Sequence, residues 1–138
     1  MAGPSGRRKP GMLAARWAAA PDSPYRAVTV ERERRVMVHL VAFITAHPGK
    51  RAELLAAFRE IVPVVRAEAG CIEYGPVVDL DGFGGFQTPL GPDTYAVIEQ
   101  WESADALRAH AAAPHMAEYG ARTRHLIARR VLHVLTAA

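Results

Sequence analysis

Beyond residue 36, short apolar runs alternate with amphipathic segments along the chain. Val38–Thr45 is rich in β-branched side chains, which predicts a strand that ends before a His-Pro-Gly turn. The segment after that turn has apolar residues three and four positions apart, which predicts a helix. Its apolar face would consist of Leu54, Leu55, Phe58, Ile61, Val62 and Val65. We expect Pro63 to bend this helix and Gly70 to end it.

The rest of the chain adds three strands and a second helical region. The strands are predicted at Cys71–Asp79, Thr94–Trp101 and Ala128–Leu135. Ser103 is a favourable N-cap for the helical region, and Pro114 divides that region into helices over Ala104–Ala112 and His115–His125. The resulting order, β-α-β-β-α-β, predicts the α+β class with a ferredoxin-like split arrangement.

The predicted sheet is apolar on both of its faces. In the first strand, Val41 and Phe43 point to one side, and Leu40, Ala42 and Ile44 point to the other. Two helices can cover only one face of a four-stranded sheet. Leaving several such side chains in water would be costly, at about 25 cal/mol per Å² of exposed apolar surface. We therefore expect a homodimer in which the second faces pack together.

Composition limits the class of protein. The chain has 138 residues, 50% of them apolar and 22% charged, which suits one globular domain. No run approaches the roughly 18 apolar residues of a membrane-spanning helix, so no membrane partner is expected. The single cysteine, Cys71, cannot form an internal disulfide, which favours a reducing compartment and hence a cytoplasmic location.

The positive net charge belongs to the amino-terminal part of the sequence. Residues 1–36 have eight basic and three acidic side chains, whereas residues 37–138 have nine basic and eleven acidic ones. The folding part is slightly acidic, so nucleic-acid binding is not expected. Residues 1–36 show no sustained hydrophobic period, and Arg16 interrupts a run that imitates an export signal. We interpret them as a disordered basic extension, with Met37 as the natural start of a domain at residues 37–138.

Candidate chemistry gathers around the break in the second helical region. His110 and His115 flank that break, and Tyr119 lies one turn after His115. A neutral imidazole there could act as a general base toward a phenolic substrate. Glu99 is expected on the same strand face as Trp101 and, if buried, needs a partner. The sequence has no C-x-x-C or H-E-x-x-H motif, so no metal site is predicted.

Three segments of the domain form a recognisable set: Glu68-Ala-Gly-Cys71, Ile98-Glu-Gln-Trp-Glu-Ser103, and Pro114-His-Met116 followed by Tyr119. Together they resemble the antibiotic-biosynthesis-monooxygenase (ABM) family, and within it the quinol monooxygenase group, over residues 37–135. The resemblance implies a dimeric α+β barrel with an apolar cavity between the sheet and the helices of each subunit. It also implies oxidation of a quinol or related phenol by molecular oxygen, with no flavin, haem or metal cofactor.

The same resemblance implies roles for individual residues. His110, His115 and Tyr119 would be catalytic, and the substrate would be bound by Tyr74, Phe86, Glu99, Trp101 and Met116. A haem-degrading branch of the superfamily is disfavoured, because His110 and Gly120 stand where that branch has a tryptophan and the iron-ligating histidine. Without the resemblance, Tyr74, Phe86 and Trp101 would be interpreted as core, whereas the two histidines would either line a functional pocket or fix the helix break through backbone hydrogen bonds.

Two other functions remain open at this point. An isomerase of a small phosphorylated diketone would need cationic side chains in the cavity, and Arg66, Arg108, Arg122 and Arg124 are available. A non-catalytic dimer that binds quinones or other aromatic metabolites would show the same sequence pattern. The glycine-rich loop at residues 80–93 contains Phe83 and Phe86, and we expect it to be a mobile cover of the cavity or to pack across the dimer.

Overall fold

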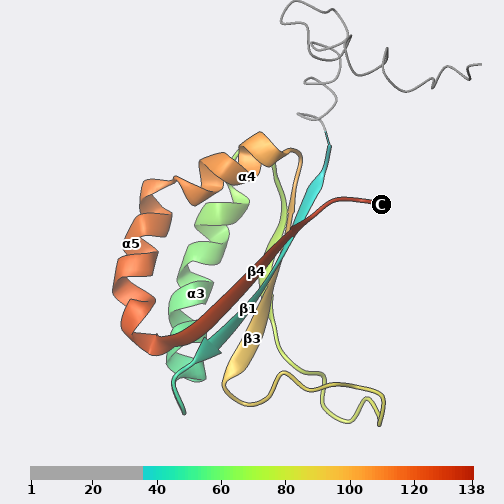
Figure 1. Cartoon of the computed structure of the whole chain (residues 1–138). Coiled ribbons are helices and arrows are strands. Elements are labelled where there is room, and N and C mark those ends of the chain that lie inside the picture. Colours follow the sequence, from blue (N-terminus) through green and yellow to red (C-terminus); the bar gives the residue numbers. More distant parts are fainter. Residues whose placement is uncertain (1–35) are drawn as a thin grey trace, which may run out of the picture. The chain divides into compact units, whose positions relative to one another are not determined.

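The computed structural model describes residues 36–138, so the predicted basic extension lies outside the described residues except for Val36. The described part contains four strands, three α-helices and one 3₁₀ turn (Figure 1). In chain order they are β1 Val38–Ala46, α3 Arg51–Arg66, β2 Cys71–Val77, β3 Thr94–Trp101, α4 Ala104–Ala111, α5 Pro114–Thr123, η1 Arg124–Leu126 and β4 Ile127–Leu135. None of the helices in this part is long and apolar enough to cross a membrane.

The predicted ferredoxin-like α+β fold is confirmed. The strands form one sheet in the order β2-β3-β1-β4, and each neighbouring pair is antiparallel. The helical connections return the chain across the same side of the sheet, so the helices lie on one face of it (Figure 1). We refer to the face beneath the helices as the inner face and to the opposite one as the outer face.

Alternation along the strands assigns residues to the two faces. In β1, Leu40, Ala42 and Ile44 are buried on the inner face, whereas Val41 and Phe43 are half-buried on the outer face. The strand register extends this division across the sheet, because paired residues of neighbouring strands share a face. The inner face and the helices together form the core, whose most buried large side chains include Leu54, Val65, Tyr74, Tyr95 and Trp101.

Helix α3 packs its predicted apolar face on the sheet and continues through Pro63 to Arg66. Gly70 then turns the chain into β2 with a φ of +82°. A Cβ at this position would lie 2.6 Å from the Cβ of Ala106 in α4, so only glycine fits both the backbone conformation and the space. This tight turn holds Glu68 next to α4.

The second helical region is divided at Pro114, as predicted. The Ser103 hydroxyl accepts a hydrogen bond from the Ala106 N–H at 3.1 Å and caps α4. Helix α4 ends at Ala111, and Pro114 is the first residue of α5. The N–H groups in the first turn of a helix have no backbone partner, so proline, which lacks an N–H group, is well suited to that position. The break places the end of α4 and the first turn of α5 side by side.

The outer face has no cover within residues 36–138. Figure 1 shows no helix on that side of the sheet. Apart from the buried Ala96, its apolar side chains are half-buried or exposed, and the Phe43 ring packs edge-on against His133 with centroids 6.3 Å apart. Apolar residues therefore occur on both faces of the sheet, as expected, and those on the outer face are Val41, Phe43, Val77, Ala96, Ile98, Val131 and Leu135.

Hydrogen bonds hold the long connection between β2 and β3 at the places where it leaves and rejoins the sheet. Asp79, which we expected to end the second strand, instead accepts hydrogen bonds from the N–H groups of Leu90 and Gly91 at 2.8 and 2.9 Å. These two bonds hold the pKa of Asp79 below its ordinary value. Arg51 donates to the carbonyl oxygens of Gly91 and Thr94 at 3.0 and 3.1 Å. The loop therefore leaves and rejoins the sheet at fixed points.

Candidate functional site

A cavity of about 320 Å³ lies beneath the helices, on the inner face of the sheet. Its floor consists of apolar side chains of β1 and β3, and its walls come from α4, α5 and β4. The volume lies within the range of small-molecule pockets, and the lining is mainly apolar with a few polar groups, as such pockets usually are. The polar side chains that line it are those of Tyr74, Tyr95, Glu99, His110, Tyr119 and Arg130.

His110 is buried in the wall of the cavity, with 5% of the residue exposed. Its ring centroid lies 4.7 Å from that of Trp101 and 5.5 Å from that of Tyr74. The Nδ1 atom is 3.1 Å from each carboxylate oxygen of Glu68. Because a carboxylate only accepts hydrogen bonds, Nδ1 donates, and the neutral ring keeps its lone pair on Nε2. The contact with Glu68 therefore prepares Nε2 to accept a proton.

Glu68 also contacts His115, whose Nε2 lies 2.5 Å from the Glu68 Oε1 atom. The three side chains come from the turn after α3, from α4 and from the first turn of α5. The helix break thus serves to bring two histidines to one carboxylate. Their nitrogen and oxygen atoms lie within 4.8 Å of one another, a donor set that could also hold a divalent cation.

Glu99 is buried on β3, with 6% of the residue exposed. The Trp101 indole Nε1 donates a hydrogen bond to its Oε2 at 2.9 Å, so the partner that a buried glutamate needs comes from the same strand. Burial raises the pKa of Glu99 above its ordinary value, and the Trp101 hydrogen bond and the nearby His110 oppose that effect. Glu99 lines the cavity, whereas Trp101 lies behind His110.

Three tyrosines line the cavity: Tyr74, Tyr95 and Tyr119. Burial raises the pKa of each phenol above its ordinary value. All three therefore keep their protons at neutral pH, when a phenol can donate a hydrogen bond to an oxygen of a bound molecule. The phenol groups of Tyr119 and Tyr95 interact with each other, so α5 and β3 approach each other at the cavity.

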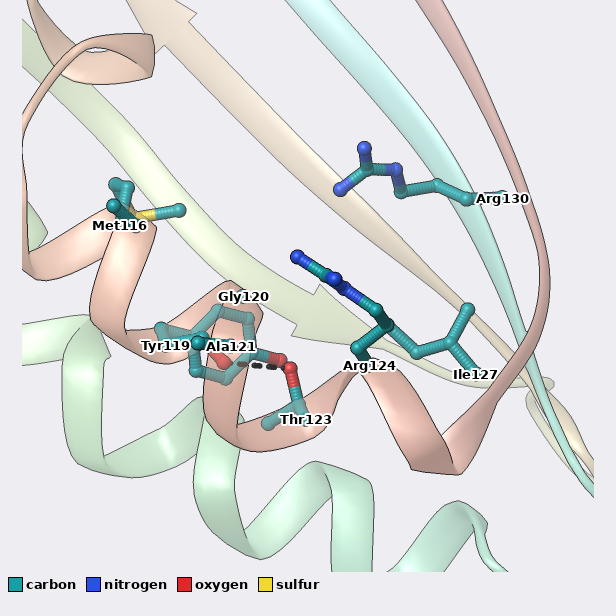
Figure 2. Close-up of a pocket in the computed structure, with 9 residues that line it drawn as sticks. Met116, Tyr119, Gly120, Ala121, Thr123, Arg124, Ile127 and Arg130 are labelled. Atoms are coloured by element: carbon teal, nitrogen blue, oxygen red, sulfur yellow. Dashed lines mark hydrogen bonds between the residues drawn. The ribbon is translucent and has the colours of Figure 1, made fainter.

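A second hollow, of about 510 Å³, lies between α5, η1 and β4 (Figure 2). The guanidinium groups of Arg124 and Arg130 extend into this same space (Figure 2). The two hollows adjoin, because they have five lining residues in common: Met116, Ala117, Tyr119, Ile127 and Arg130. An apolar cavity with a base in its wall therefore continues into a cationic one.

Most of the predicted site residues meet at this place. The cavity lining includes His110, Tyr119, Tyr74, Glu99 and Met116. Trp101 and His115 stand behind it, in contact with His110 and Glu68. Phe86 does not join them, because its side chain is 84% exposed on the loop and packs against Phe83 with ring centroids 5.2 Å apart. The expected substrate contact by Phe86 is absent from the cavity of one protomer.

The arginines that the isomerase alternative would need in the cavity mostly have other partners. Arg66 donates to the Tyr74 carbonyl oxygen, and Arg108 and Arg122 pair with carboxylates on the helix surfaces. Among these four arginines, Arg124 is the one that lines either of the two hollows described above.

Three polar residues of the site were not assigned a role from the sequence, namely Glu68, Tyr95 and Arg130. Glu68 was noted within a motif, but its contact with the histidines depends on the fold of the turn at Gly70. Arg130 could have been found from strand alternation, because it lies two residues before Leu132 and therefore on the same face.

Comparison with known proteins agrees with this geometry. Residues 37–122 match the model of the family described as antibiotic biosynthesis monooxygenase. The probable quinol monooxygenase YgiN of Escherichia coli K12 is 42% identical over 85 residues, which span 60% of this chain and 81% of the relative.

Solved structures show the same fold. The crystal structure of PA3566 from Pseudomonas aeruginosa matches with a TM-score of 0.63 and 27% identity, covering 75% of this chain and 95% of the other. SnoaB from Streptomyces nogalater, described as a cofactor-independent oxygenase, matches with a TM-score of 0.59, covering 73% of this chain and 92% of the other. Its 21% identity supports the likeness of fold alone. The family match over most of the domain and the close relative together establish that this chain belongs to the antibiotic biosynthesis monooxygenase family and is an enzyme of the monooxygenase class.

Proposed function

We propose that this enzyme oxidises a quinol or a related aromatic phenol with molecular oxygen, and that it needs no flavin, haem or metal cofactor. The observation that supports this proposal most directly is His110, which Glu68 orients at the wall of a mainly apolar cavity. A volume of about 320 Å³ is sufficient for fused aromatic rings. The name of the E. coli relative, a probable quinol monooxygenase, agrees with this substrate class.

The proposed reaction begins with a proton transfer. Nε2 of His110 accepts the hydroxyl proton of the substrate, and the Glu68 carboxylate stabilises the imidazolium that forms. His115 contacts Glu68 and acts as a positioning residue for this pair. Tyr119 keeps its proton, because burial raises its pKa, and can donate a hydrogen bond to the substrate oxygen. The ring is held by Tyr74, Glu99 and Met116, and Trp101 supports His110 from behind.

The phenolate is electron-rich enough to pass one electron to oxygen, which gives a substrate radical and superoxide. If the phenol has a free ring position, the two radicals combine there, and the hydroperoxide loses water to leave a quinone. If the substrate is a quinol, the second electron and both protons follow, and the products are quinone and hydrogen peroxide. The apolar walls keep water away from the radical pair in either case.

We further propose that the enzyme is a homodimer and acts in the cytoplasm. The uncovered apolar outer face supports the dimer, because packing two such faces against each other would remove them from water. The presence of a single cysteine in the sequence supports a reducing compartment.

Oxygen uptake with a reduced naphthoquinone tests the proposed reaction. The protein is first treated with EDTA, and superoxide dismutase is added to suppress uncatalysed chain oxidation. We expect the protein to accelerate oxygen consumption above the protein-free rate, with quinone and hydrogen peroxide formed in equal amounts from a quinol.

Three results would contradict the proposal. An unaccelerated rate with a panel of naphthols and naphthoquinols would exclude this substrate class. Binding of the quinones without turnover of any reduced form would instead favour the binding role. Loss of the acceleration on EDTA treatment, with recovery on adding a metal ion, would refute the cofactor-independent part.

A further inference from the structure

We propose that the preferred aromatic substrate has an anionic substituent, a carboxylate or a similar oxyanion, which binds between Arg124 and Arg130. The aromatic part of this ligand rests on the proposed function. The anion site itself rests on the positions and partners of the two arginines.

Arg130 lies on the side of β4 where a charge is least expected. It pairs with Ile44, which is buried on the inner face, and it lines the cavity together with Leu132. Arg129, its neighbour, pairs with Thr45 and belongs to the outer face. Arg130 and Arg124 are both exposed, so their guanidinium groups are hydrated in the free protein and accessible to a ligand from solvent.

The protein itself supplies no acidic partner for either arginine in the described part of the chain. No acidic side chain lines the hollow that contains Arg124 and Arg130. Glu99 lines the neighbouring cavity, but it is already bonded to Trp101. Neither guanidinium forms a hydrogen bond or an ion pair with another described residue, in contrast to Arg51, Arg66, Arg108 and Arg122.

The two arginines are placed to act together. Arg124 comes from η1 and Arg130 from β4, and their guanidinium groups extend into the same space (Figure 2). Two guanidinium groups on one oxyanion form charge-assisted hydrogen bonds, and their planar geometry suits carboxylate and phosphate. The pair therefore provides the positive charge and the donors that an anionic group requires.

The anion site is continuous with the catalytic cavity. Arg130 and Tyr119 line both hollows. A rigid aromatic ligand can therefore place its hydroxyl group toward His110 and its anionic group toward the arginines at the same time. This arrangement would also fix which end of the substrate meets the base.

The experiment compares two ligands of nearly equal shape, 6-hydroxy-2-naphthoate and its neutral amide, 6-hydroxy-2-naphthamide. Calorimetric titration of the full chain at low salt measures the affinity of each. We expect the acid to bind roughly tenfold or more tightly than the amide, because hydrogen bonds to charged groups contribute that much. The preference should fall in Arg130→Gln and vanish in the Arg124→Gln/Arg130→Gln double variant. It should persist in Arg59→Gln, an exposed control on α3 with the same change of charge.

Equal affinity of the parent protein for acid and amide would overturn the inference. So would a preference that survives in the double variant, or a failure of the folded parent, checked by circular dichroism, to bind either ligand. Oxygen uptake with a neutral naphthoquinol separates this result from the proposed function. Turnover of the neutral quinol without a preference for the acid would refute the anion site and leave the proposed oxidation intact. A preference for the acid without any turnover would refute the proposed oxidation and leave the anion site intact.

Discussion

The two faces of the sheet are formed by alternate residues of the same strands, yet they differ in almost every property. The inner face lies beneath the helices, and the groups that line its cavity include a histidine, a glutamate and an arginine. The outer face has an apolar patch around Val41 and Phe43, and no helix of the described part covers it. A shift of one residue in register would exchange the two faces. Alternate residues of the same strand therefore serve different purposes: those on the inner face line the catalytic cavity, and those on the outer face form the proposed dimer contact.

The largest expected effect comes from removing the base on the inner side. In His110→Gln, the amide can still donate to Glu68 but cannot take up a proton, so we expect kcat/KM for the quinol to fall by roughly 10²- to 10⁴-fold. Titration with the oxidised quinone should show that binding is retained. His47→Gln, at an exposed turn, is the matched control. Full activity in the His110 variant would show that another group accepts the proton.

The corresponding change on the outer face should affect assembly. Val41 pairs with Ile98 and His133 and stands in the middle of the apolar outer surface. Val41→Asp would bury an unpaired charge in the proposed dimer, which costs several kcal/mol, so sedimentation should show a dimeric parent and a monomeric variant. Circular dichroism should be unchanged. A parent that sediments as a monomer would refute the dimer, and with it this interpretation of the outer face.

A smaller effect is expected when His110 is kept but its orientation is weakened. Glu68→Gln replaces a charge-assisted hydrogen bond with a neutral one, which should lower kcat by roughly tenfold to a hundredfold. The pH profile of kcat should move, because the variant no longer stabilises the imidazolium, while KM should change little. Glu60→Gln, on the exposed surface of α3, is the control. An unchanged pH profile would reduce Glu68 to a structural role.

The smallest effect concerns stability and its dependence on pH. Burial raises the pKa of Glu99, so the native protein keeps this proton to a higher pH than the unfolded chain does. The free energy of unfolding therefore falls as the pH rises above the ordinary glutamate value of about 4.3.

Glu99→Gln removes this charge, and its carbonyl oxygen can still accept from Trp101. Urea denaturation should show the variant to be more stable than the parent at about pH 8, by about 1.4 kcal/mol for each unit by which the pKa is raised. The difference should disappear below about pH 4. A variant that is less stable than the parent at the higher pH would mean that the Glu99 charge is favourable in the fold.

The elements of the fold could be predicted closely from local pattern. Apolar spacing identified α3, and Ser103 and Pro114 marked where α4 and α5 begin, because caps and prolines act over a few residues. The second strand was predicted two residues too long. Asp79 is compatible with a strand in sequence, but it bonds to Leu90 and Gly91, eleven and twelve residues later. A contact over that distance leaves no local signal.

The candidate site could be predicted only in part. His110, Tyr119 and Glu99 were identified by residue type and position, and they line the cavity. The resemblance to the family implied a substrate contact for Phe86, but this residue lies exposed on the loop and outside the cavity. Arg130 was overlooked, although alternation from Leu132 already placed it on the inner face.

By itself, the sequence determined the order of strands and helices, the alternation that makes both faces apolar, and the motifs that mark the family. Each of these depends on residues close together in the chain. The tertiary structure decided which side chains meet: Glu68 reaches His110 across 42 positions, and Arg124 and Arg130 share one hollow that adjoins the catalytic cavity. Such encounters depend on how the helices dock on the sheet, because the free energy of docking is summed over the whole core and is not encoded at any single position.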